Sequence, residues 1–215
     1  MVTVLTIISM LFIVVATWFL GLWNNVITFV NVLLAAMIAS NWFEPLADQL
    51  DAGQSSYTYL LDFVCLWLMF FGTLILLRVA TDLLSRTRVE FDIWLDRSLR
   101  TVFSLATAWV FACFLQFSMH LAPLPLDQFQ PDPTATNFVG QPDRLWLGFL
   151  QSRSRGALAA PLAEPLAAAY DTGQLHPADR DLNSRVFDSR SDFIFKYRAR
   201  RRSLGEQAGL RVQRR

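Results

Sequence analysis

The chain has 215 residues, of which 53% are hydrophobic and 17% are charged, whereas a soluble domain carries about 25% charged residues. No Asp, Glu, Lys or Arg occurs in residues 1–43 or in residues 101–126. This distribution excludes a soluble globule and predicts an all-α membrane protein.

The uncharged first 43 residues predict two transmembrane spans, over about residues 2–20 and 24–43. One straight helix of this length would reach about 64 Å, around twice the roughly 30 Å hydrocarbon thickness of a bilayer. The predicted break follows Gly21, which loosens the helix, and Asn24 can cap the next one. Residues 41–45 are expected to end the second span, followed by an acidic loop that contains Glu44, Asp48 and Asp51.

Two further spans are predicted over about residues 57–77 and 101–121. Arg78 and Asp82 are expected to prolong the third helix into water. The fourth span stops before Pro123, because the residue that precedes a proline avoids the helical region. The sequence therefore predicts a four-span transmembrane domain over residues 1–122.

The remaining residues are expected to form a partly disordered tail. Residues 123–142 hold five of the nine prolines and predict an extended linker. Residues 143–170 predict an amphipathic helical segment that either lies in the membrane interface, docks on a partner or packs on its own protein. Its apolar side consists of Leu145, Trp146, Phe149 and Leu150.

Residues 171–215 are polar and Arg-rich, with too little apolar surface to offset the entropy of ordering, so we expect much of this segment to be mobile. Its basic cluster could contact phosphate or anionic lipid, and the alternative is a solvated run of charge. The cluster consists of Arg198, Arg200, Arg201 and Arg202.

Orientation is predicted from the arginines near the span ends, since short basic loops resist translocation. The loop 78–100 contains five arginines, whereas the loop 44–56 contains no basic residue. We therefore expect the loop 78–100 to be cytoplasmic and both termini to lie on the non-cytoplasmic side of the membrane. Nucleic acid is not expected as a partner there.

No catalytic, metal-binding or nucleotide-binding motif occurs, so no enzymatic activity, metal or cofactor is predicted. Asp62 is the one ionisable side chain within the limits of a span, and an intramembrane acid is by default a functional hypothesis. The alternative is that Asp62 is simply hydrated, because Tyr57 and Tyr59 place the interface just before it.

Small and polar side chains recur at helical spacing within the spans and predict seams where helices approach closely. A water pathway is the alternative. In the second span the stripe consists of Asn24, Thr28, Asn31 and Ala35. The first span has Thr6, Ser9 and Thr17, and the fourth has Thr101, Ser104, Ala108 and Ala112.

Several segments carry a family resemblance, namely 57–63, Arg78, 82–83, 91–92 and 95–97, in a layout of four spans with an acidic second loop. In this layout, residues 1–122 resemble the bacterial CvpA family, named for colicin V production. The family usually has an Arg-Gly pair in the first turn, where this chain has Asn24-Asn25. It also has glycines around the start of the fourth span, where this chain has Asp96, Arg100 and Ser104.

The resemblance implies an inner-membrane protein needed for toxin production or export and for envelope integrity, and it implies no catalytic residue. The resulting hypothesis is a non-enzymatic accessory or scaffold protein. Its expected partners are the lipid bilayer and an unidentified envelope protein, with a homo-oligomer as a further candidate. The alternative is an oligomeric small transporter or channel subunit.

Overall fold

The computed structural model describes residues 2–51, 58–84, 92–123, 140–154, 187–188, 191 and 193–206. The chain forms two compact units. The first comprises Met1–Pro123 and Asn137–Asp143, and the second comprises Leu124–Thr136 and Arg144–Arg215.

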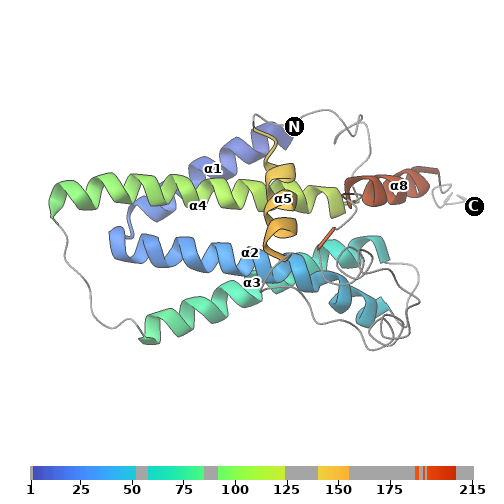
Figure 1. Ribbon diagram of the computed structural model, residues 1–215, viewed down its shortest axis with the longest axis horizontal. Helices are drawn as coiled ribbons and strands as arrows, with labels where there is room; N and C mark the ends of the chain where they lie inside the picture. The colour runs from blue at the N-terminus through green and yellow to red at the C-terminus, as the bar shows by residue number, and fades with distance from the viewer. Residues whose placement is uncertain are drawn as a thin grey trace, which may run out of the picture. The chain divides into compact units, whose positions relative to one another are not determined.

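The first unit is a bundle of apolar helices (Figure 1). Its helices are α1 (Val2–Trp18), α2 (Leu22–Asp51), α3 (Thr58–Leu84) and α4 (Ile93–Leu121). Within the described residues, α2, α3 and α4 are long and apolar enough to cross a membrane, whereas α1 is apolar but shorter. The predicted all-α membrane class is confirmed, with three helices that meet the length for a span and one that does not.

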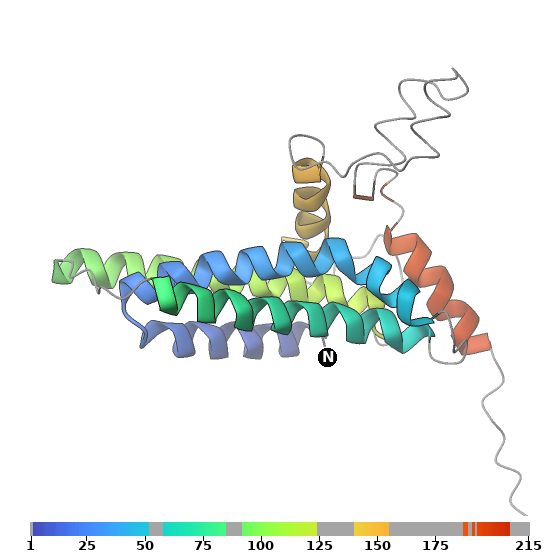
Figure 2. The ribbon, with the colours of Figure 1, turned by 90° about the horizontal axis from the view of Figure 1, so that it is seen from below.

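The helices run alternately up and down (Figure 2), with α2 and α4 as the inner pair (Figure 1). α1 packs mainly against α4, and α3 packs mainly against α2. Leu22 contacts Asp96, Phe29 contacts Phe103 and Phe43 contacts Phe117, and the partners of each pair are 74 residues apart. This constant offset shows that α2 and α4 run parallel in one register over most of their length.

Two of the predicted helix ends differ in the structure. α2 continues through Pro45 to Asp51, so the acidic loop predicted for Glu44, Asp48 and Asp51 is wrong. Proline removes one backbone donor, and transmembrane helices tolerate this where neighbouring groups compensate. Residues 52–57 lie outside the described residues.

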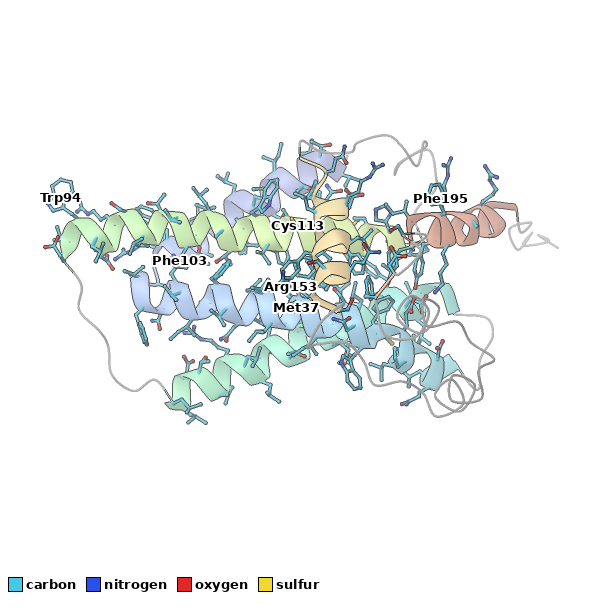
Figure 3. All side chains as sticks on the ribbon, in the orientation of Figure 1. Met37, Trp94, Phe103, Cys113, Arg153 and Phe195 are labelled. Atoms are coloured by element: carbon cyan, nitrogen blue, oxygen red, sulfur yellow. The ribbon has the colours of Figure 1, made fainter. Side chains whose placement is uncertain are left out.

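α4 begins at Ile93, eight residues before the predicted span. The Asp92 side chain caps it by accepting a hydrogen bond from the backbone nitrogen of Trp94 at 3.3 Å. Trp94 projects from this first turn away from the neighbouring helices (Figure 3). The predicted end is confirmed, because Ala122 turns to an extended conformation immediately before Pro123.

Small and aromatic side chains fill the interior in separate places. Ala35, Ala36 and Ala39 are fully buried on α2, where the missing side-chain bulk lets neighbouring helices approach closely. Aromatic rings join α3 to α4, with Phe70 stacked on Phe114 at 4.6 Å between ring centroids. The remaining rings of this cluster are Phe63, Trp67, Phe71, Phe111 and Phe117.

The tail contains more helix than the sequence predicts. α5 (Pro142–Ser154) lies where the amphipathic segment is expected, and α8 (Phe193–Glu206) lies within the segment expected to be mobile. A helix forms there because Phe193 and Tyr197 are buried one turn apart and supply an apolar anchor. The rest of the 123–142 linker, and most of the predicted segments 143–170 and 171–215, lie outside the described residues.

Candidate functional site: the polar seams of the helix bundle

The turn between α1 and α2 is held by a charged pair from α4. Gly21 has a φ of 79° in this turn, a conformation that glycine adopts without steric cost. The Asp96 carboxylate accepts a hydrogen bond from the backbone nitrogen of Leu22 at 3.2 Å and forms an ion pair with Arg100. The Arg100 guanidinium donates to the carbonyl of Trp18 at 3.5 Å. We call these contacts the α4 clamp.

Each charge of the clamp complements the helix end that it contacts. A helix carries partial positive charge at its N-terminus and partial negative charge at its C-terminus. Asp96 lies at the first residue of α2, and Arg100 lies at the last residue of α1. A single ion pair on α4 therefore satisfies backbone groups at the ends of two other helices.

Asn25 joins the clamp from α2. Its amide nitrogen donates to the Ser104 hydroxyl at 2.6 Å and to the Arg100 carbonyl at 3.1 Å, and the side chain is fully buried. The sequence stripe identified Asn24, but the Asn24 side chain is only half-buried and its carbonyl accepts a bond from Thr28 within α2. Adjacent residues on a helix differ by about 100° in direction, so Asn25 faces α4 and Asn24 does not.

A second seam lies between α2 and α3. The Asn31 amide donates to the Thr81 hydroxyl at 3.1 Å, which confirms that this part of the stripe lies at a helix contact. One turn earlier on α2, the Thr28 hydroxyl accepts a bond from Arg78 at 3.4 Å. Arg78 also pairs with Asp82 at 3.1 Å along α3.

A third seam lies between α1 and α4. The Gln116 amide donates to the Thr6 hydroxyl at 2.7 Å, and both side chains are buried. Of the stripe predicted for the first span, Thr6 and Thr17 are buried, whereas Ser9 bonds back to a carbonyl of its own helix. Of the stripe predicted for the fourth span, the buried members are Ser104, Ala108 and Ala112.

Asp62 is buried near the beginning of α3, with 6% of its surface exposed. Because α2 and α4 begin at the clamp and α3 returns, the start of α3 lies at the opposite end of the bundle. Asp62 is therefore far from Asn31 and from the clamp, and the structure does not bring the predicted polar residues into one site.

The same end of the bundle holds a buried pair that the sequence reasoning missed. His120 Nε2 lies 3.0 Å from Asp143 Oδ2, and both residues are buried. Gly140 precedes this contact with a φ of 82°, and a side chain there would meet the Trp109 ring at 3.3 Å. The pair and the close approach of Gly140 fix residues 140–143 to α4. The one signal in the sequence was an acid in the first turn of an amphipathic helix.

The predicted apolar face of α5 is shifted. Trp146 and Leu150 are buried as expected, but Leu145 is exposed and Leu147 is buried in its place. The burial of these side chains favours the alternative that this helix packs within its own chain. Phe149 is half-buried, with Arg153 over its ring at 6.0 Å.

The predicted basic cluster lies in α8, where all four arginines belong to one helix. Arg198 is half-buried and Arg202 is exposed. In the part of the chain that the structure describes, no group of three or more His, Cys, Asp or Glu side chains is placed to hold a metal ion.

These features define a helical membrane-protein domain whose buried polar groups join its helices, with a tail that follows α4. A family model described as "Colicin V production protein" matches residues 2–137, and the chain belongs to this family. No curated protein and no solved structure matches the chain. Within the clamp, Asn25 contacts both Arg100 and Ser104.

Replacing Asn25 with alanine tests the clamp. We expect Asn25→Ala to lower the free energy of unfolding by about 1 kcal/mol, since two interhelical hydrogen bonds of about 0.6 kcal/mol each are lost. Unfolding in mixed detergent micelles, followed by the helical signal, measures the change. Asn24→Ala is the matched control and should change the free energy by less than about 0.5 kcal/mol. An equal loss in both variants would contradict the assignment of Asn25.

Proposed function

We propose that this protein is a non-enzymatic accessory or scaffold protein of the inner membrane that supports the production or export of a colicin V-like toxin and envelope homeostasis. The observation that carries the proposal is the use of the buried amides. Asn25, Asn31 and Gln116 each bond a second helix, so these polar groups hold the bundle together. Family membership supports the link to colicin production.

We propose that α1 is a fourth membrane span. It is about 25 Å long and runs beside α4, with Trp18 at Arg100 and Thr6 at Gln116. Apart from Thr3 and Ala16, its exposed side chains are large and apolar, as a lipid-facing surface requires. These side chains are Val4, Leu5, Ile7, Ile8, Leu11, Phe12 and Val15.

The proposed bilayer boundaries follow from two exposed tryptophans on α2. Trp23 and Trp42 lie about 28 Å apart along the helix, which is close to the roughly 30 Å thickness of the hydrocarbon core. Tryptophan is enriched at the two membrane interfaces. The clamp then lies at one interface, and His120 lies beyond the other.

The second candidate function is an oligomeric transporter or channel subunit, which the burial of Asp62 in α3 favours. An acid that carries ions or protons has to be essential for flux. For the scaffold function we expect no Asp62-dependent flux of protons or alkali cations into vesicles that contain the purified protein. We also expect Asp62→Asn to restore toxin release to a null strain as fully as the wild type does.

The flux measurement uses vesicles with matched amounts of wild-type protein and of the Asp62→Asn variant, with empty vesicles as the control. Selective flux in the wild type that disappears in the variant would replace the scaffold function with the transporter.

The scaffold function also requires an envelope partner, and Leu145 is the exposed apolar side chain of α5 from which to seek it. A photo-crosslinking residue at position 145 should give a discrete adduct in intact cells, whereas the same residue at the buried position Leu147 should not. Mass spectrometry then identifies the partner. An adduct made of two copies of this chain would identify a homo-oligomer, and equal products at both positions would contradict the proposed contact.

We propose that the clamp end of the bundle faces the cytoplasm. Arginine occurs at this end, as Arg78, Arg97 and Arg100, whereas the helix ends at the other side carry Glu44, Asp48 and Asp62. Retention of arginine on the cytoplasmic side sets the orientation of most membrane proteins.

Reporters fused after residue 206 and in the 85–91 loop test this orientation. A periplasm-active phosphatase should be active at the C-terminal position and inactive in the loop. The reverse pattern would invert the proposed topology, and a cytoplasm-active reporter at each site provides the control.

A further inference from the structure

α8 has two opposite faces of different chemistry. Phe193 and Tyr197 lie on one face, are 4% and 3% exposed, and have ring centroids 4.6 Å apart. Phe195 is 57% exposed, although it lies two residues from each of them. Side chains two positions apart on a helix point about 200° away from each other, so Phe195 faces away from the packed side.

Basic side chains share the face of Phe195. Arg198, Ala199 and Arg202 follow it at steps of three or four residues, and Ala199 and Arg202 are exposed. Lys196 borders this face, with its ammonium 5.4 Å from the Tyr197 ring centroid. The basic residues are Lys196, Arg198, Arg200, Arg201 and Arg202, whereas Glu206 is the one acid of the helix.

The helix is held to the turn before it by specific polar contacts. The Asp188 carboxylate accepts a hydrogen bond from the backbone nitrogen of Phe193 at 3.1 Å, which caps the start of α8. Gln151 on α5 donates to the Asp188 carbonyl at 2.8 Å, and the Ser154 hydroxyl accepts from the Phe187 nitrogen at 2.9 Å. The aromatic and basic face of α8 is thus presented by a structured support.

We propose that α8 docks on the surface of an anionic phospholipid bilayer, with Phe195 at the headgroup and acyl boundary and Arg202 and its basic neighbours at the phosphates. Figure 3 marks Phe195 on this helix. This inference rests on the proposed membrane location of the bundle, because α8 must be tethered beside a bilayer. The proposed ligand of α8 is therefore the anionic phospholipid headgroup.

Charge and apolar exposure together select a lipid surface over an acidic protein. Arginines alone could bind any polyanion. A large exposed aromatic ring within the basic face also needs an apolar layer behind the negative charge. A bilayer that contains phosphatidylglycerol supplies both in one plane. Each basic side chain near such a surface contributes about 1 kcal/mol.

The test uses the full chain with Ala199→Cys, reconstituted in vesicles of phosphatidylcholine alone or mixed with phosphatidylglycerol. The native Cys65 and Cys113 are buried, and the unsubstituted chain measures their background labelling. A membrane-impermeant maleimide should label the introduced thiol rapidly in phosphatidylcholine and slowly in the mixed vesicles, and high salt should restore rapid labelling. Labelling is normalised to the total obtained in detergent.

Two variants in the same background identify the residues responsible. Arg202→Gln should lower the ratio of docked to free α8 about fivefold in the mixed vesicles, and Phe195→Ser should also accelerate labelling. Arg153→Gln on α5 removes the same charge from another exposed position and should leave the rate unchanged.

Equal labelling rates in the two kinds of vesicle would overturn the proposal, as would slow labelling in both that salt does not change, which would indicate a protein contact. An effect of Arg153→Gln equal to that of Arg202→Gln would overturn it as well. Flotation of the vesicles tests the membrane location of the bundle separately from the docking of α8. A bundle that is inserted in the membrane must float with vesicles of phosphatidylcholine alone.

Discussion

The bundle depends on how two helix ends are satisfied at the turn around Gly21, where backbone groups have no partner within their own helices. Asp96 and Arg100 lie one turn apart on α4, so their charges are spaced to meet the start of α2 and the end of α1. Each charge offsets the other where the two side chains pack against the helix ends, because a partly buried charge without a partner is costly. Together they fix the position of α1 and α2 against α4, and the constant register of α2 with α4 follows from that end.

Polar side chains in a membrane bundle can line a pathway for water or ions, or they can form hydrogen bonds between helices. The described contacts of the buried amides are hydrogen bonds between helices. Each amide is joined to a hydroxyl on a neighbouring helix, and large apolar side chains are exposed on all four helices of the bundle. The same bundle holds the residue from which the tail departs, because His120 pairs with Asp143. A helix bundle of this kind is suited to hold other components at the membrane, which supports the proposed accessory function.

Features that depend on neighbouring residues in the chain were predicted correctly from the sequence. Features that depend on residues distant in the sequence were not. Pro123 ends α4 as predicted, because the restriction on the residue before a proline is local. Pro45 does not end α2, so the local restriction that ends α4 before Pro123 does not end α2. Asn24 and Asn25 are equivalent in type and adjacent in position, so only the direction of α4 could distinguish them. Leu147 was missed on α5 because the pattern of apolar residues alone did not determine which side of that helix is buried.

Composition by itself determined that the chain is an apolar helical protein of the membrane, since long uncharged segments leave the backbone no other way to satisfy its hydrogen bonds in lipid. The apolar runs also located all four helices of the bundle, although α2 ends eight residues after its predicted end and α4 begins eight residues before its predicted start. The tertiary structure alone decided which polar groups meet, because partners such as Asn25 and Ser104 are separated by 79 residues and no local pattern records that separation. The pairing of His120 with Asp143 and the outward position of Phe195 were decided in the same way, by the packing of helices whose own sequences allow several faces to turn inward.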